Sequence, residues 1–271
     1  RARARVIRCA NVADAGHCVN DVNVNDNDDY AYFYNGAYAW AHTAGNATIG
    51  NRTFGDINMT VGDGYGANPE IYLSATAASG TATIGTLTVG NVDVSVGDSS
   101  EGFFTIEDTL SIAASYKSTS SIGAVSLGNV TVDAGEEGLS KVRILVDADE
   151  GTVNGVTIGN VASTAGDGGV VNVALDVSGD RKVGNVKIGN LTVALGEGGT
   201  MEDSDPIISI SSSETLVGTV GNVTLGNVDI TLAKGAAAAN NVNSDDNTND
   251  NNNNNDDDDN NNNNDDDDDE D

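Results

Sequence analysis

Apolar and polar residues alternate over short stretches along most of this chain, and the alternation changes phase at fixed places. In IGTLTVGNVDVSVG (84–97) Leu87 and Val89 hold odd positions before Gly90, whereas Val92, Val94 and Val96 hold even positions after Asn91. Strand side chains alternate with a period of two, so half of this set would be exposed unless the backbone bends at the phase change. The pattern predicts a corner at Gly90-Asn91, where both residue types tolerate positive φ. An earlier phase change follows Ile84, so we expect two corners and two short strands per copy.

The same stretch recurs six times, which indicates a repeat protein. Its anchor glycines are 30 to 38 residues apart and are Gly55, Gly90, Gly128, Gly159, Gly189 and Gly226. Each copy continues into a glycine-rich acidic turn and then a second, longer alternation, such as KVRILVDA (141–148). The longer alternation predicts a third side to each coil.

Three sides with inward Val, Ile and Leu are typical of a parallel β-solenoid. We therefore predict an all-β fold, a three-sided β-helix of about six coils over 46–239, roughly 30 Å tall at about 4.8 Å per coil. An N-terminal arm or cap (1–45) precedes it. An Asn/Asp-rich tail (240–271) follows and is expected to be disordered, because it has too little apolar surface to offset ordering entropy. The alternative is an antiparallel meander with the acidic turns as hairpin loops, which gives no reason for the two phase changes.

One short segment and the overall plan carry resemblances to known proteins. GNVTL-GNVDI (221–230) resembles a coil of the pentapeptide-repeat proteins over about ten residues. The plan of the whole chain resembles the secreted and cell-surface β-solenoid repeat proteins. The first likeness implies no function here, and the second implies the solenoid architecture.

Charge restricts the partners that this chain can have. The 271 residues include 42 Asp and Glu against 12 Lys and Arg, a formal net charge of −30. Nucleic acids and anionic lipid surfaces would be repelled, whereas cations and the basic ends of neighbouring copies would be attracted. We expect cations to gather diffusely at the acidic tail. No stretch approaches the roughly 18 to 20 apolar residues of a membrane span, so we expect no membrane insertion.

The two cysteines, Cys9 and Cys18, lie close together in sequence. We expect a structural disulfide between them, with free thiols as the alternative. A disulfide favours an oxidising compartment, so the predicted location is extracellular or at the cell surface. The chain opens with Arg-Ala-Arg-Ala-Arg and no initiator Met, from which we expect a terminus already trimmed of any targeting peptide.

An acidic stretch near the N-terminus is a candidate calcium site. Its oxygen-bearing residues are Asp21, Asn23, Asn25, Asp26, Asp28 and Asp29. An EF-hand loop would have Gly at its sixth position and Glu at its twelfth, where this chain has Asp26 and Tyr32. Two interpretations stay open, a calcium-binding loop and a solvated acidic loop.

Asparagine recurs directly after the anchor glycine. The recurring residues are Asn91, Asn129, Asn160, Asn190 and Asn227, with Asp56 in the first copy. In register they predict a structural ladder in which each amide hydrogen-bonds to the one above.

Catalysis has little support in the sequence, and we predict that the protein is not an enzyme. His17 and His42 both lie outside the repeats, and no nucleophile elbow, phosphate-binding loop or zinc-protease motif occurs.

The segment DYAYFYNGAYAWA (29–41) combines high β-propensity with residues that are favoured at interfaces. Its aromatic residues are Tyr30, Tyr32, Phe33, Tyr34, Tyr38 and Trp40. The last copy lacks its third side, which leaves an open strand edge. We predict that the N-terminal arm adds a strand to, or stacks on, this edge of a neighbouring copy, which gives a head-to-tail filament. The alternative is that 29–41 caps its own first coil at Ile49.

The predicted function is therefore a self-assembling subunit of an extracellular or cell-surface fibre. The second hypothesis is a monomeric surface adhesin or carbohydrate-binding module. A polysaccharide lyase or hydrolase is the least favoured of the three.

Overall fold

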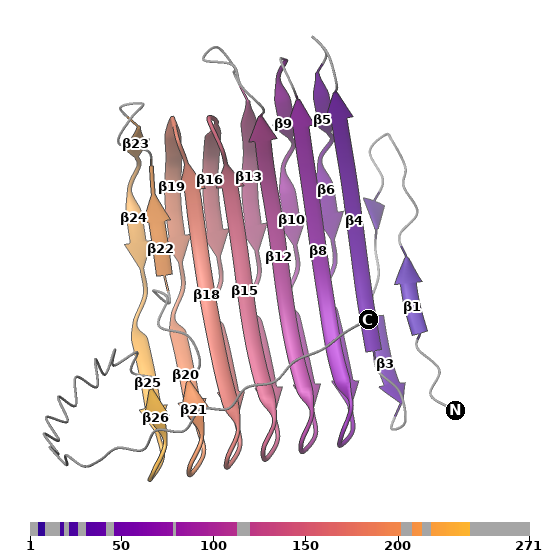
Figure 1. Ribbon diagram of the computed structural model, residues 1–271, viewed down its shortest axis with the longest axis vertical. Coiled ribbons are helices and arrows are strands. Elements are labelled where there is room, and N and C mark those ends of the chain that lie inside the picture. The colour runs from indigo at the N-terminus through magenta and orange to yellow at the C-terminus, as the bar shows by residue number, and fades with distance from the viewer. Residues whose placement is uncertain are drawn as a thin grey trace, which may run out of the picture. The chain divides into compact units, whose positions relative to one another are not determined.

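The computed structural model describes residues 5–8, 17–18, 22–26, 31–41, 46–77, 80–112, 120–201, 208–212 and 218–238, with the backbone path alone before residue 46, at residue 103 and over 105–112. Throughout these ranges the regular secondary structure is β-strand, and every strand pair is parallel. The strands form three sheets (Figure 1). The predicted parallel β-solenoid is confirmed, and the antiparallel meander is wrong.

Sheet A contains the longest strands. Its members are β1 (Arg5–Arg8), β4 (Ala31–Ala41), β8 (Gly66–Ala77), β12 (Glu101–Ile112), β15 (Leu139–Ala148), β18 (Val170–Gly179), β21 (Thr200–Met201), β22 (Ile208–Ser211) and β26 (Ala237–Ala238).

Sheet B follows sheet A along the chain. Its members are β2 (His17–Cys18), β5 (Ala47–Ile49), β6 (Arg52–Phe54), β9 (Ala82–Ile84), β10 (Leu87–Val89), β13 (Ser121–Leu127), β16 (Thr152–Ile158), β19 (Lys182–Ile188), β23 (Thr219–Val220) and β24 (Val223–Leu225).

Sheet C has one strand of constant length per coil. Its members are β3 (Val22–Asp26), β7 (Ile57–Val61), β11 (Val92–Val96), β14 (Val130–Ala134), β17 (Val161–Ala165), β20 (Leu191–Leu195) and β25 (Val228–Leu232).

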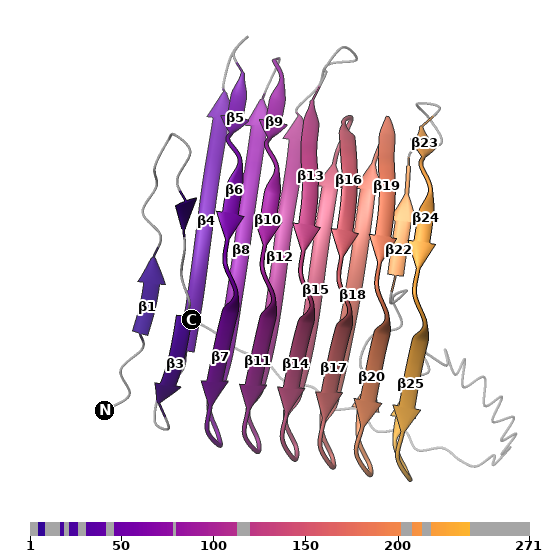
Figure 2. The same cartoon turned by 180° about the vertical axis from the view of Figure 1, so that it is seen from behind.

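Each coil runs from sheet B through sheet C to sheet A. The five repeat coils from β5 to β22 have strands on all three sides, as does the N-terminal coil of β2, β3 and β4, and the sixth repeat coil, β23 to β26, has only two paired residues in sheet A. Sheet A forms one broad wall, and sheets B and C follow each other end to end along the opposite wall (Figure 2). The apolar layer between these walls is thin and consists mainly of Val, Ile, Leu and Ala, as few aromatic residues are available.

Register places equivalent residues of successive coils directly above one another. In sheet C one inward column contains Val92, Val130, Val161 and Leu191, all 0 to 1% exposed. The inward positions of each strand are therefore covered by the coils on both sides, and the solenoid core is continuous along its axis.

The Gly-Asn steps form the corner between sheets B and C, but for a different reason from the one predicted. None of the anchor glycines or the following asparagines that the structure describes has positive φ. Glycine is required there because successive coils stack closely. A Cβ on Gly159 would lie 2.7 Å from both Oδ1 of Asn129 and the carbonyl oxygen of Gly128.

The earlier phase change, after Ile84, is not a corner between sheets. Strands β9 and β10 on either side of it both belong to sheet B, and in the next coil β13 runs through without a break. Within β13 the buried residues Ile122 and Val125 are three positions apart. The phase change therefore marks an irregularity within one strand, which side-chain alternation cannot distinguish from a corner.

Positive φ occurs instead in the acidic turn between sheets C and A. The third residue of the turn has φ between 51° and 76° in every coil, at Gly64, Ser99, Glu137, Gly168, Gly198 and Gly235. Four of these six residues are glycine, which adopts this conformation without strain.

The solenoid extends ahead of residue 46, the boundary expected from the sequence. Strand β4 pairs with β8 over its whole length, from Ala31 opposite Ala67 to Ala41 opposite Ala77. Strands β2 and β3 pair with β6 and β7. The N-terminal strands therefore add one coil to the same three sheets, and the segment 31–41 lies on its own first coil.

Candidate assembly interface

The sixth coil exposes side chains whose register partners in the fifth coil are buried in the core. The inward residues of β20 are buried, whereas their register partners in β25 are exposed. Exposure is 0, 0 and 3% for Leu191, Val193 and Leu195, and 49, 42 and 41% for Val228, Ile230 and Leu232. The last coil therefore presents an uncovered apolar surface.

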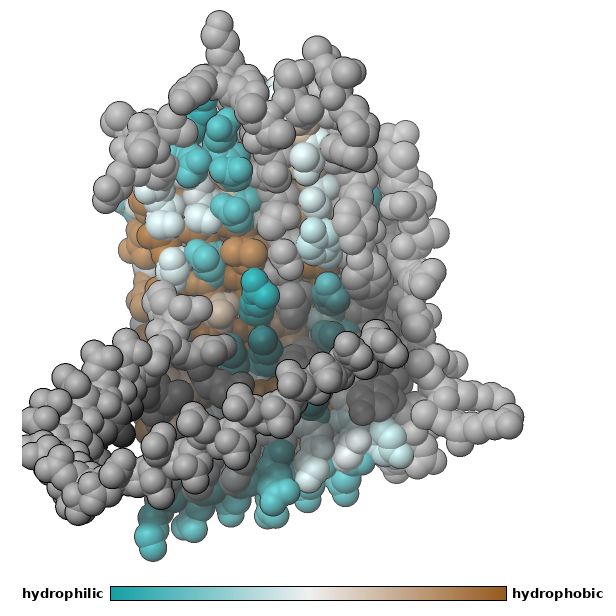
Figure 3. Space-filling view, in the orientation of Figure 1, coloured by the Kyte–Doolittle hydropathy of each residue, from teal (hydrophilic) through white to brown (hydrophobic). Residues whose placement is uncertain are grey.

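Sheet B extends this surface. Val223 and Leu225 of β24 pair with the buried Val186 and Ile188 of β19, yet are 50 and 43% exposed. With Val220 they complete the six exposed large apolar residues that the structure describes. Brown, hydrophobic surface lies on the left of the space-filling view, over the coils at this end (Figure 3). We call the six residues the end patch: Val220, Val223, Leu225, Val228, Ile230 and Leu232.

Both ends of the stack also have strands with one unpaired side. Within the described chain, β25 pairs only with β20, and β3, at the opposite end of sheet C, pairs only with β7. Edge strands with free N–H and C=O groups are templates for another chain. Because the two ends belong to the same three parallel sheets, one end is geometrically compatible with the other.

The asparagines at the corner between sheets B and C form a ladder along the axis. Oδ1 of Asn91 accepts a hydrogen bond from the backbone N–H of Asn129 at 3.0 Å, and the pattern repeats upward to Asn227. Asp56 occupies the first position and accepts from the backbone N–H of Asn91 at 2.7 Å. The donor at each step is thus the backbone of the next coil. At the first step the side-chain amide of Asn91 also donates to Oδ1 of Asp56, at 3.2 Å, as the sequence suggested.

The ladder ends on a residue that receives no donor. Oδ1 of Asn227 accepts no hydrogen bond from any part of the chain that the structure describes, whereas Oδ1 of Asn190 accepts from Asn227 at 2.9 Å. The sixth coil therefore offers an open acceptor beside the end patch.

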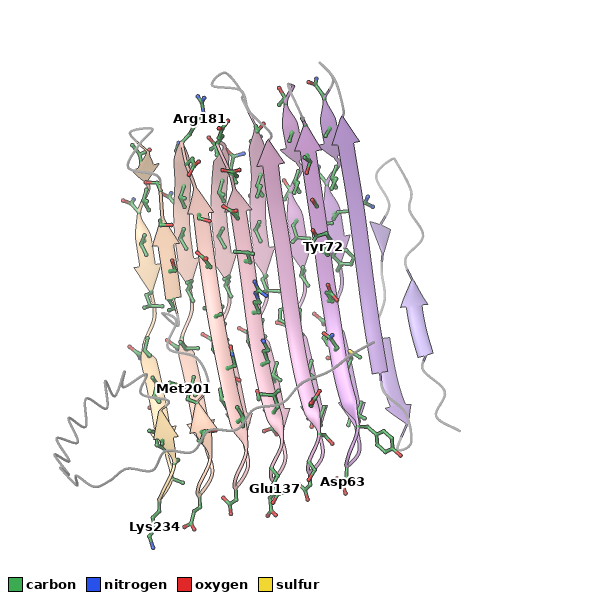
Figure 4. All side chains as sticks on the ribbon, viewed as in Figure 1. Asp63, Tyr72, Glu137, Arg181, Met201 and Lys234 are labelled. Atoms are coloured by element: carbon green, nitrogen blue, oxygen red, sulfur yellow. The ribbon has the colours of Figure 1, made fainter. Side chains whose placement is uncertain are left out.

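A second ladder, which the sequence reasoning missed, follows the acidic turns. Oδ1 of Asp63 accepts from the backbone N–H of Asp98, and Oδ1 of Asp167 from that of Glu197. The second turn position is acidic in five coils and holds Lys234 in the sixth. Asp63, Glu137 and Lys234 mark this edge at the foot of Figure 4. The equal spacing of these residues from the anchor glycines was the signal that could have identified the ladder.

A group of carboxylates lies where sheet A meets the connections to sheet B. Burial raises the pKa of Asp147, and the nearby Asp176 and Asp180 raise it further, against a hydrogen bond from Ser178 Oγ at 2.7 Å that lowers it. Burial and Asp180 also raise the pKa of Asp149. No group of three or more His, Cys, Asp or Glu in the described ranges could hold a metal ion.

The N-terminal residues singled out from the sequence are placed only in part. Asn23, Asn25 and Asp26 lie in strand β3, and Cys18 lies in β2. Strand β4 contains Tyr32, Phe33, Tyr34, Tyr38 and Trp40. The other residues fall outside the described chain, namely Cys9, Asp21, Asp28, Asp29 and Tyr30. The predicted disulfide and calcium site consequently stay predictions.

No known protein family, curated protein or solved structure matches this chain. Among the residues that the structure describes, no helix is long and apolar enough to cross a membrane.

Proposed function

We propose that this protein is a structural subunit that polymerises end to end, with the N-terminal coil (β2, β3 and β4) of one copy stacked on the sixth coil of the next. The observation that carries the proposal is the end patch, whose residues are 39 to 50% exposed although they continue columns that are buried elsewhere. Covering apolar surface is the main favourable term in association. A heterologous contact between two different ends does not close, so it produces a filament.

Two further observations support the second copy as the partner. The open strand edges at the two ends belong to the same parallel sheets, so a copy stacked in register would continue all three. The repeat also supplies a second copy with backbone N–H groups at the spacing of the corner ladder. The proposed role is structural, with no catalytic step, and the proposed location is extracellular or at the cell surface.

The first test is electron microscopy and sedimentation of the purified chain. Sheet C has seven strands, so in-register stacking gives an axial repeat of about 34 Å at about 4.8 Å per strand. Ile230→Lys places a charge in the end patch and should abolish filaments, whereas Thr231→Lys, on the adjacent position of the same strand, should leave them intact. Monodisperse wild-type protein, or filaments that survive Ile230→Lys, would refute the proposal.

Calcium and the monomeric alternative are examined by the same assay. We propose calcium at the segment 21–29 as a cofactor of assembly, for which filament formation should be lost in a chelator and restored by added calcium. A monomeric adhesin or carbohydrate-binding module would stay dispersed under both conditions.

A further inference from the structure

Aromatic residues are concentrated in one part of sheet A. All those in the described strands of this sheet lie in β4, β8 and β12, and β15 and β18 further along have none. In the described strands of sheets B and C the one aromatic residue is Phe54, which is buried. The two walls of the solenoid therefore differ in chemistry, and the N-terminal part of sheet A is the aromatic one.

Pairing between β4 and β8 shows which face of sheet A these residues occupy. In β8 buried residues alternate with half-buried ones, and the half-buried positions from Asn68 to Thr76 form the outer face. Their register partners in β4 are Tyr32, Tyr34, Gly36, Tyr38 and Trp40. At the remaining position Gly36 is paired with Tyr72 of β8 (Figure 4). Each of these five outward columns therefore holds an aromatic residue in β4 or in β8.

Polar residues of β8 are the neighbours of these aromatic residues. The register partners of Tyr32, Tyr34, Tyr38 and Trp40 are Asn68, Glu70, Ser74 and Thr76. Tyr and Trp provide large apolar ring surfaces, and amide, carboxylate and hydroxyl groups provide hydrogen-bond donors and acceptors. This combination suits a ligand that has apolar C–H faces edged by hydroxyl groups, which is the surface of a sugar ring.

Charge restricts the ligand to an uncharged one. Strand β4 has no charged residue and β8 has only Glu70, in a chain whose net charge is −30. Anionic glycans are repelled by such a chain, and cations are drawn to its acidic turns instead of to this face. The outward positions of β15, by contrast, include Lys141, Arg143 and Asp147. The aromatic part of sheet A is thus an uncharged surface that matches an uncharged ligand.

Strand geometry restricts the ligand to a straight polymer. From Tyr32 to Trp40 the strand spans about 26 Å at about 3.3 Å per residue, which is longer than one sugar ring. A β-strand is extended, so a ligand that contacts both ends of this row must be extended too. Polysaccharides with β-1,4 linkages are straight and present the flat faces of successive rings, whereas α-1,4-linked chains coil.

We infer that the outer face of β4 and β8 binds a neutral β-1,4-linked polysaccharide that runs along the strands. The aromatic residues of β4 stack on the sugar rings, and the polar residues of β8 hydrogen-bond to the hydroxyl groups. Sheet A is a side wall of the solenoid, whereas the proposed assembly uses the two ends. The inference is therefore a function beyond assembly, and in a filament the site recurs once in every subunit.

Isothermal titration calorimetry of the full chain with cellohexaose, mannohexaose and xylohexaose tests the inference. At least one of these β-1,4-linked hexasaccharides should bind. Maltohexaose, which has the composition of cellohexaose but α-1,4 linkages, should not bind, and neither should anionic hexagalacturonate.

Variants locate the binding on the aromatic row. Trp40→Ala and Tyr38→Ala should each weaken binding about tenfold or more, whereas Trp40→Phe keeps a ring and should retain most of the affinity. Leu145→Ala, at an outward position of β15 in the same sheet, is the matched control and should bind as wild type does. Far-ultraviolet circular dichroism checks that each variant retains its strands.

The outcomes separate this inference from the proposed function. Failure of all three hexasaccharides to bind, equal binding of maltohexaose, or full affinity in the two alanine variants would overturn the site while assembly stands. Ile230→Lys, which should abolish filaments, should bind the hexasaccharide as tightly as wild type, and loss of binding in this variant would contradict a site on the side wall. Absence of wild-type filaments would remove the proposed assembly and leave the polysaccharide site in place.

Discussion

The fifth and sixth coils have similar sequences but differ in what covers them. Strand β20 reads LTVAL and strand β25 reads VDITL, paired residue for residue. The inward side chains of β20 are buried, and those of β25 are more than two-fifths exposed. In this fold the burial of a side chain thus depends on the coil above it and on the completed third side, so the same apolar pattern is core in one coil and exposed surface in the next.

The largest difference should appear when the same charge is placed in both coils. Val193→Asp buries a carboxylate in the continuous core and should lower the free energy of unfolding by more than about 3 kcal/mol. Ile230→Asp should cost the monomer less than about 1 kcal/mol, because water already reaches that position. Urea unfolding at a concentration below the onset of assembly measures both. Equal losses would mean that the end patch is covered within a single subunit.

A smaller effect should follow from adding one methyl group at the corner. Gly159→Ala places a Cβ 2.7 Å from atoms of the preceding coil, so neighbouring coils must shift, at a cost of about 1 to 3 kcal/mol. Gly55→Ala is the matched control, because no atom of the described residues lies within 4 Å of its Cβ position. Thermal unfolding followed by circular dichroism should separate the two variants. A neutral Gly159→Ala would show that the coils stack more loosely than described.

Removing a ladder acceptor should destabilise the monomer in a middle coil but not in the last coil, where no described donor uses it. Asn129→Ala removes the acceptor for the backbone N–H of Asn160 and should destabilise the monomer by about 1 kcal/mol. Asn227→Ala removes an acceptor that no described donor uses, so monomer stability should hardly change while the critical concentration for assembly rises. If Asn227→Ala destabilised the monomer as much as Asn129→Ala, the ladder would already be complete within one chain.

Glycine at a turn position that has positive φ should raise the stability of the monomer. Glu137 has φ of 53°, a left-handed conformation that is costly for a residue with a side chain. Glu137→Gly should therefore stabilise the monomer by up to about 1 kcal/mol. Gly168→Ala, at the equivalent turn position with φ of 67°, should destabilise it by a similar amount. Differential scanning calorimetry should show a higher melting temperature for Glu137→Gly and a lower one for Gly168→Ala. Shifts of the same sign would contradict the strain at this turn position.

The smallest expected effect depends on pH and concerns Asp147, near the C-terminal end of strand β15. The pKa of Asp147 is raised in the folded protein by burial and by Asp176 and Asp180. Between the unfolded pKa and the raised folded pKa the native state binds more protons, so stability falls as pH rises through that interval. Asp147→Asn keeps an acceptor for Ser178 and removes the charge. It should melt about 1 to 2 °C higher at pH 7, with no advantage at pH 3; an equal advantage at both values would exclude the electrostatic cause.

The sequence was sufficient to predict the architecture because the solenoid is a local pattern repeated. The phase change at Gly90-Asn91 located the corner between sheets B and C, and the recurrence of the pattern set the pairing of the coils. Side-chain alternation reports a phase change but not the direction of the backbone. For this reason the change after Ile84 was interpreted as a second corner, although it lies within sheet B.

The atomic contacts between successive coils could not be predicted from the sequence. The need for glycine at position 159 comes from atoms of Gly128 and Asn129 in another coil, and no local pattern encodes that distance. The N-terminal coil was missed because 17–41 lacks the Gly-Asn step, although VNVN (22–25) has the alternation that strand β3 uses. The open last edge was predicted from its missing third side, but the exposed residues themselves required the register.

The distribution of segment lengths within a coil determines where the molecule tolerates change. In the first five repeats the turn glycine follows the anchor glycine at the same distance, as in Gly90 to Gly97 and Gly159 to Gly166, and in the sixth Ala233 takes that position. The variation in coil length falls late in sheet A and in the connections to sheet B, such as 113–120 between β12 and β13. Insertions at this one edge leave the columns undisturbed, so foreign peptides could be displayed there in a row, spaced by about 4.8 Å per coil. The solenoid thereby separates a fixed scaffold from an edge that is free to diversify.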